Sequence, residues 1–151
     1  MNYNEALTLC ADKLIKPFEG CHKRLPNGLI APYICPAGVP TQGWGIVVPS
    51  MNVPPITKEM ADAILMRELP VYMSEALKLS PVLAKYPERL AAITSFVFNL
   101  GASRYRASTL RKRVNDEDWE GAKAEIVKWN RGGGKVLPGL VRRRAAEAAL
   151  L

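Results

Sequence analysis

The sequence predicts an α+β fold, in which an N-terminal helix and a small antiparallel β region accompany a mainly helical C-terminal part. Apolar residues recur at helical spacing over residues 3–18 and again beyond residue 57. Between these stretches, residues 21–56 are rich in proline and glycine and carry short β-rich runs such as Ile46-Val47-Val48. At 151 residues, the chain is long enough to bury the core of one domain.

The first helix is followed by a set of hairpins or a small sheet. Leu7 and Leu14 lie at helical spacing, and Pro17 should kink or end the helix just before Gly20. The helical pattern returns at Thr57, which is expected to act as an N-cap.

The next two helices have clear boundary residues. The helix that starts after Thr57 should run to about Ser80, with a kink near Pro70. A second helix should start near Pro87 and stop at Gly101, because glycine readily takes the left-handed conformation at a helix end. Its apolar stripe consists of Leu90, Ile93, Val97 and Leu100.

Shorter helices follow. Ser108 or Thr109 should open a basic helix through Val114, and Asn115 or Asp116 should cap the next helix. The apolar stripe of that helix consists of Trp119, Ala122, Ile126 and Trp129.

The C-terminal stretch combines a break with a last helix. Gly132-Gly133-Gly134 is expected to be a flexible break, and Pro138 suits the first turn of a helix that ends at Leu151.

The expected organisation is a single domain over residues 1–151. A β-containing lobe should cover about 19–56 and a helical lobe about 57–151, with the 1–18 helix packing on the helical lobe. A cleft between the lobes is the default place for a functional site.

The net charge of +7 favours a polyanionic partner without choosing among nucleic acid, an anionic membrane face and an acidic wall polymer. The three cysteines and one histidine form no metal-binding motif, so neither a metal nor another cofactor is expected. The odd cysteine count favours reduced thiols and folding in the cytoplasm. No signal peptide or membrane-spanning stretch is predicted.

Several motifs coincide in order along the chain. They are Phe18-Glu19-Gly20, Tyr33-x-Cys35-x-x-Gly38-Val39-x-Thr41-x-Gly43-x-Gly45, Ser95 to Gly101, Ser108-Thr109-Leu110, Trp129, and Gly133 to Arg144. Together they resemble the phage lysozymes, glycoside hydrolase family 24. The resemblance implies a lysozyme-like fold with the active site in the cleft. It also implies an endolysin with muramidase activity, which lyses the host by cleaving the β-1,4 bond between N-acetylmuramic acid and N-acetylglucosamine.

The resemblance assigns Glu19 as the general acid and matches Thr41 to the family's threonine, but the family's aspartate falls on Cys35. Between Glu19 and Glu59 there is no other acidic residue. Glycoside hydrolysis ordinarily uses two carboxyl groups. The second role must therefore fall to Cys35, to Thr41 with a water molecule, or to no residue.

A cysteine can take that role only as a thiolate, which requires a lowered pKa. The cationic residues His22, Lys23, Arg24 and Arg142 to Arg144 are candidates for lowering it.

The resemblance also implies substrate contacts at Val47, Phe98, Asn99 and Thr109, and a supporting arginine, Arg142 or Arg143, on the Glu19 carboxylate. Where the family usually has histidine this chain has Ile46, and Trp44 could either pack or line the cleft.

Alternatives remain at this stage. Inversion by an oriented water and retention through a cysteine adduct are both open. A lytic transglycosylase needs only one carboxylate, and a wall-binding protein without activity needs none. A nucleic-acid-binding module is a further alternative, which is suggested by the basic runs Arg111-Lys112-Arg113 and Arg142-Arg143-Arg144.

The favoured partner is peptidoglycan, with no nucleic acid, no stable membrane span and no second subunit. The resemblance implies accumulation in the host cytoplasm, release through a holin and action on the cell wall in the periplasm.

Overall fold

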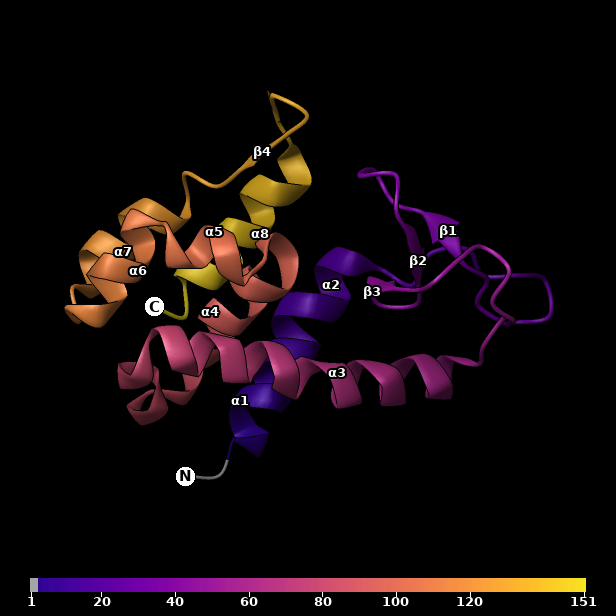
Figure 1. Cartoon of the computed structure of the whole chain (residues 1–151), viewed down its shortest axis with the longest axis horizontal. Helices are drawn as coiled ribbons and strands as arrows, with labels where there is room; N and C mark the ends of the chain where they lie inside the picture. Colours follow the sequence, from indigo (N-terminus) through magenta and orange to yellow (C-terminus); the bar gives the residue numbers. More distant parts are fainter. Residues whose placement is uncertain (1–2) are drawn as a thin grey trace. The chain divides into compact units, whose positions relative to one another are not determined.

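The computed structural model describes residues 3–151, which divide into two compact units (Figure 1). The helical unit comprises residues 3–14 and 69–151, and the β unit comprises residues 15–68. The β unit is thus longer at both ends than the expected 19–56 lobe, and it takes in parts of two helices. The α+β class is confirmed, with helices in the majority.

The N-terminal helix consists of α1 (Asn4–Leu9), a π-helical segment η1 (Cys10–Ile15) and α2 (Lys16–Glu19). Pro17 lies in α2, directly after the π-helical segment. The helix ends at Glu19 because Gly20 has a positive φ of 61°. The expected helix is confirmed over its described part; residues 1 and 2 lie outside the described residues.

The β region is a three-stranded antiparallel sheet in the order β1 (Tyr33–Ile34), β2 (Pro40–Gln42) and β3 (Ile46–Val47). In its register Thr41 pairs with Tyr33 on one side and Val47 on the other. The buried Gln42 donates hydrogen bonds of 3.0 Å from Nε2 to the carbonyl oxygens of Ile30 and Pro54. These bonds tie the flanking loops to the middle strand.

The helix α3 (Lys58–Leu79) begins as predicted. The Met60 amide donates to the Thr57 hydroxyl oxygen at 3.1 Å, which confirms Thr57 as the N-cap. The helix continues through Pro70 and ends one residue before Ser80. The boundary between the two units falls inside this helix.

The helical unit is completed by a 3₁₀ segment and five helices. These are η2 (Pro81–Lys85), α4 (Pro87–Leu100), α5 (Ala102–Arg106), α6 (Thr109–Asn115), α7 (Trp119–Ile126) and α8 (Pro138–Ala148). Gly101, with a φ of 94°, ends α4, and the Ser108 hydroxyl caps α6 by accepting from the Arg111 amide. Both predicted boundaries are confirmed.

The predicted cap of α7 is wrong. Asp118, rather than Asn115 or Asp116, accepts a hydrogen bond of 3.0 Å from the Gly121 amide. The chain cannot enter the helix earlier because Glu117 has a positive φ of 55°.

The predicted flexible break at Gly132-Gly133-Gly134 is a hairpin instead. Strands β4 (Arg131–Gly132) and β5 (Lys135–Val136) pair in antiparallel fashion. The two loop residues, Gly133 and Gly134, have φ values of 59° and 79°. Positive φ at both positions is what a type I′ hairpin turn requires, and glycine adopts it without strain.

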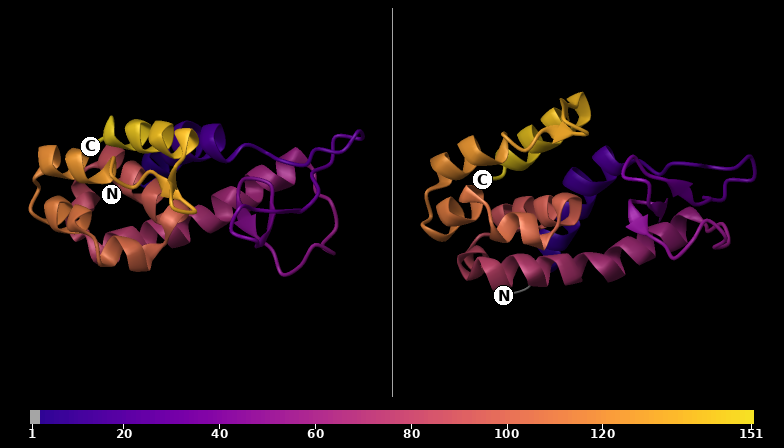
Figure 2. Two further views of the ribbon diagram at one scale, coloured as in Figure 1. Left: turned by 90° about the horizontal axis from the view of Figure 1, so that it is seen from above. Right: turned by 45° about the horizontal axis from the view of Figure 1, so that its top comes forward.

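The core of the helical unit is built around α4, against which α1, α5 and α8 pack (Figure 2). Its predicted stripe is buried at Leu90, Ile93 and Val97 and half-buried at Leu100. Trp119 and Trp129 pack on this core as predicted. Among the described residues, no helix is apolar over a length that would carry it across a membrane.

A buried polar network joins α8 to α4. Arg143, Arg144 and Glu147 of α8 and Ser95 of α4 are each at most 2% exposed. The Glu147 carboxylate accepts from Ser95 at 2.6 Å and pairs with Arg144 Nε at 2.6 Å and Arg143 Nε at 3.6 Å. Burial raises the pKa of Glu147, and the guanidinium groups of Arg144 and Arg143 oppose that rise. Each buried charge in this network therefore depends on its partners.

We expect Glu147→Gln to lower the free energy of unfolding by about 3 kcal/mol, because it removes the buried carboxylate that pairs with both guanidinium groups. Urea denaturation followed by circular dichroism measures the change. Glu120→Gln is the control, since Glu120 pairs with Lys123 at the surface and its side chain is 88% exposed. Equal effects of the two substitutions would contradict the prediction.

Candidate active site

Glu19 is held against the turn between β2 and β3. It ends α2, and its carboxyl group lies against the backbone of Gly45. A Cβ atom at Gly45 would stand 2.6 Å from Glu19 Oε2 and 2.9 Å from Cδ. Gly45 also has a φ of 88°, so both its backbone conformation and this close approach require glycine.

Trp44 fixes the position of that turn. It is buried, and its indole Nε1 donates to Asp62 Oδ1 of α3 at 2.7 Å. Lys16 of α2 lies 5.6 Å from the centroid of the Trp44 ring and 3.4 Å from the same Asp62 oxygen. Trp44 is therefore a packing residue that ties α2, α3 and the turn together.

The Asp62 carboxylate is the acceptor on which these contacts converge. Burial acts to raise its pKa, but hydrogen bonds from Lys58 and Trp44 and the charge of Lys16 hold the pKa below its usual value. Asp62 therefore stays ionised at neutral pH and keeps the turn in place.

One face of the sheet carries the residues that the sequence singled out. Tyr33, Thr41 and Val47 lie directly opposite one another on adjacent strands, so their side chains share a face. Thr41 is buried, whereas Val47 is 67% exposed. The Thr41 hydroxyl donates to the Val39 carbonyl oxygen at 2.9 Å. The register thus places Thr41 beside Val47.

Cys35 follows β1, and its amide donates to the Val39 carbonyl oxygen at 3.0 Å. The pKa of its thiol lies below the usual value, mainly because the Val39 backbone hydrogen-bonds the thiolate. Hydrogen bonds from the Ala37 backbone and the Thr41 hydroxyl act in the same direction, while burial opposes them. The sequence pointed to cationic neighbours as the cause, but the principal cause is local backbone.

Tyr33 is a site residue that the motif contains but to which the sequence assigned no role. Burial raises its pKa to about 12, with further contributions from the negative charges of Glu19, Cys35 and Cys21. The Tyr33 hydroxyl is thus within electrostatic reach of both Glu19 and Cys35. The alternation of side chains along β1 and its pairing with Thr41 were the signals that could have identified it.

The remaining predicted residues belong to the helical unit. Phe98 is half-buried and makes an edge contact with Tyr72, their ring centroids 5.0 Å apart. Asn99 accepts a hydrogen bond of 2.8 Å from Arg144. Thr109, the first residue of α6, is exposed.

The two supporting arginines have different environments. Arg142 is exposed, whereas Arg143 is buried in the network with Ser95 and Glu147. Because both arginines lie in the helical unit, their predicted contact with Glu19 in the β unit stays a prediction.

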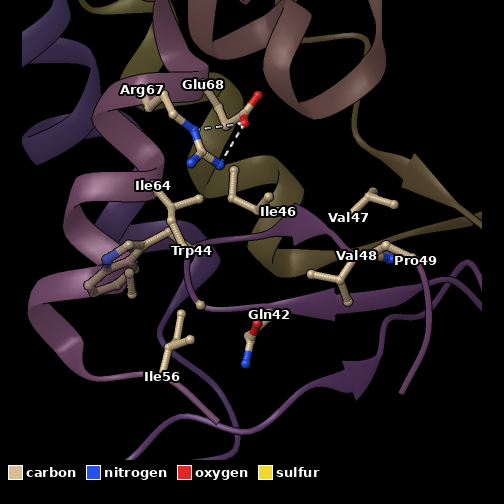
Figure 3. Close-up of a pocket in the computed structure, with 12 residues that line it drawn as sticks. Gln42, Trp44, Ile46, Val47, Val48, Pro49, Ile56, Ile64, Arg67 and Glu68 are labelled. Atoms are coloured by element: carbon tan, nitrogen blue, oxygen red, sulfur yellow. Dashed lines mark hydrogen bonds and ion pairs between the residues drawn. The ribbon is translucent and has the colours of Figure 1, made fainter. Parts of the chain in front are cut away.

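A small pocket of about 220 Å³ lies within the β unit, which the sequence did not predict. Figure 3 shows side chains of β2 and β3, including Gln42 and Ile46, together with Ile64 of α3 and the Arg67–Glu68 ion pair. Its lining is mainly apolar. Across residues 3–151, no three or more histidine, cysteine or acidic side chains are grouped so that they could hold a metal ion.

The chain is similar to several proteins of known kind. A family model described as phage lysozyme matches residues 16–147. An endolysin from Acyrthosiphon pisum secondary endosymbiont phage 1 is 36% identical over 145 residues, which cover 91% of each chain. A SAR-endolysin from Escherichia phage Mu is 31% identical over 127 residues, covering 83% of this chain and 73% of that protein.

One solved structure is similar over nearly its whole length. The muramidase domain of SpmX from Asticaccaulis excentricus gives a TM-score of 0.75 at 26% identity, with 97% of this chain and 94% of that chain covered.

We expect Gly45→Ala to cost more stability than Gly38→Ala, because only the first substitution displaces Glu19. Both glycines have positive φ, but a Cβ at Gly38 would meet nothing within 4 Å. Backbone strain alone should cost about 1–2 kcal/mol at Gly38, and the clash should add about 1–2 kcal/mol at Gly45.

A double-mutant cycle with Glu19→Ala, measured by urea denaturation, checks the cause. In the Glu19→Ala background the two glycine substitutions should cost the same. An extra cost at Gly45 that persists there would show that Glu19 is not what Gly45 accommodates.

Proposed function

The chain belongs to the phage lysozyme family, and on that premise we propose that it hydrolyses the β-1,4 bond between N-acetylmuramic acid and N-acetylglucosamine. Its relatives include proteins named endolysin and a structure named a muramidase domain. The chain is accordingly a glycosidase of the muramidase type that degrades peptidoglycan. The bond cleaved and the residue roles below are the finer parts of the proposal.

Glu19 acts as the general acid and protonates the glycosidic oxygen of the leaving sugar. The observation that carries this role is the contact of its carboxyl group with Gly45, which orients it beside the sheet face of Tyr33 and Thr41. A general acid must be fixed within hydrogen-bonding distance of the atom that it protonates.

Cys35 acts as the general base in place of a second carboxylate. The lowered pKa of its thiol supports this role, because only the thiolate can take a proton from water. In the proposed step, water attacks the anomeric carbon, its proton passes to Cys35, and the glycosidic bond breaks as Glu19 gives up its proton. Thr41, whose hydroxyl lies beside Cys35, orients that water. Direct attack by the thiolate, with a covalent adduct and retention, is the competing route.

Substrate contacts are proposed at Val47, Phe98, Asn99 and Thr109, and support for Glu19 at Arg142 or Arg143. These assignments rest on the family resemblance. Asn99 has an additional role in this chain, since it also holds the buried Arg144.

A lytic transglycosylase is the second candidate function. In the β unit two of the other acidic residues are already engaged: Asp62 accepts a hydrogen bond from Trp44, and Glu68 pairs with Arg67. A site with one carboxylate suits a reaction in which the muramic acid's own hydroxyl attacks. The two reactions differ in product, since hydrolysis leaves a reducing end and transglycosylation an anhydro sugar.

The basic runs give little support to a nucleic-acid-binding module. Arg111 donates to the carbonyl oxygens of Leu79 and Arg106, and Arg113 pairs with Asp118. Arg143 and Arg144 are buried with Glu147. Most of the guanidinium groups in these runs are therefore already engaged.

The proposal also covers partners and location. We propose a monomer that accumulates in the host cytoplasm, is released by a holin and then acts on the cell wall. This part rests on the family resemblance, and the SAR-endolysin names of some relatives keep a holin-independent route as the alternative.

Glu19→Gln and Cys35→Ser should each reduce lysis of chloroform-treated Gram-negative cells by at least about 100-fold, because each removes a proton-transfer group. Cys21→Ser is the matched control and should retain activity. Mass spectrometry of the released muropeptides should show reducing ends. Anhydro products would assign the transglycosylase, and an active Cys35→Ser would remove Cys35 from the mechanism.

Cys35→Asp tests the thiolate separately. If Cys35 is the base, wild-type activity falls as the pH drops through its lowered thiol pKa, since protonation removes the base. A carboxyl at this position has a much lower ordinary pKa, about 4. The acidic limb of the pH–activity profile should therefore move down by several pH units in Cys35→Asp. A limb that does not move belongs to another group.

A further inference from the structure

The chain from the end of α7 to Ala146 in α8 has an unusual charge pattern. Residues 126–146 include six lysines and arginines and no acidic residue. Arg143 and Arg144 are buried, but Arg131, Lys135 and Arg142 are exposed. Three exposed positive charges thus lie within one hairpin and the first turns of α8.

The same segment exposes large apolar side chains. Val136 is 48% exposed, Val141 is 41% exposed and Leu137 is 39% exposed. Arg131 and Val136 are directly opposite in the hairpin, so this cation and this apolar side chain share a face, and Lys135 extends from the other face near the tip. We call the set Arg131, Lys135, Val136, Leu137, Val141 and Arg142 the hairpin surface.

The hairpin surface is held in place rather than loosely extended. The two glycines at the tip set the turn, and the Leu137 amide donates to the Asn130 carbonyl oxygen at 3.0 Å. The Leu137 side chain lies over Gly132, where a Cβ would be only 2.6 Å from Leu137 Cδ1. Figure 1 shows the hairpin leading directly into α8.

We propose that the hairpin surface docks on an anionic lipid bilayer as a peripheral contact. Lipid phosphates account for the cations, and the acyl boundary accounts for the exposed valines and leucine. An acidic polysaccharide or a nucleic acid would account for the charges alone. An apolar protein groove would leave the absence of acidic residues unexplained. This binding is separate from glycan cleavage and does not depend on the proposed function.

Co-sedimentation with lipid vesicles tests the proposal on the full chain. The protein should bind vesicles of phosphatidylcholine with phosphatidylglycerol, and should bind pure phosphatidylcholine far more weakly. Added salt should weaken the binding, because the attraction is electrostatic. The double variant R131Q/K135Q should bind at least about tenfold more weakly, given the contribution of each cation near an anionic surface. The double variant V136S/V141S should also lose affinity, by about threefold or more.

Matched controls separate the surface from general charge and hydrophobicity. Lys112→Gln removes an exposed cation of α6, and Val71→Ser removes a valine of α3 that is 55% exposed. Both should bind vesicles like the wild type, and circular dichroism should show every variant folded. Equal binding to neutral vesicles, or equal losses in the controls, would overturn the proposal. Loss of binding to purified peptidoglycan with unchanged vesicle binding would assign the surface to the glycan instead.

Discussion

The contact between the Glu19 carboxyl group and the Gly45 backbone is the constraint on which the β unit depends. It requires α2 to end at Glu19, the β2–β3 turn to reach the helix, and position 45 to lack a side chain. Trp44 meets the second requirement, because its bond to Asp62 anchors the turn on α3. The Asp62 carboxylate therefore acts on Glu19 indirectly, because it fixes the backbone that the Glu19 carboxyl group contacts.

In the proposed mechanism Cys35 takes the role that a second carboxylate has in ordinary glycosidases, and backbone groups support it. The amides beyond β1 stabilise the charged form of Cys35, so a thiol gains anionic character without a cationic partner. Burial raises the pKa of Tyr33 to about 12, and the negative charges of Glu19, Cys35 and Cys21 add to the rise, so the phenol stays protonated at neutral pH.

In the helical unit, charged side chains lie inside the core and pair with one another there. Glu147 pairs with two arginines in contact with α4, and Cys10 nearby is kept as a thiol because burial raises its pKa to about 12. Arginines that look like a binding surface in the sequence are structural here. The exposed cations of the hairpin surface are consequently separate from the buried network of Arg143, Arg144 and Glu147.

The sequence by itself determined the elements whose boundaries depend on short-range contacts. Thr57, Ser108, Gly101 and Pro138 act within one helical turn, so their roles followed from residue type. It also determined the family, the motif order and the lack of any acidic residue between Glu19 and Glu59. The tertiary structure alone decided the rest, because burial and long-range pairing are not encoded in local spacing. It turned three glycines into a hairpin, placed Trp44 in the packing, buried Arg143 and Arg144, and surrounded Cys35 with amides.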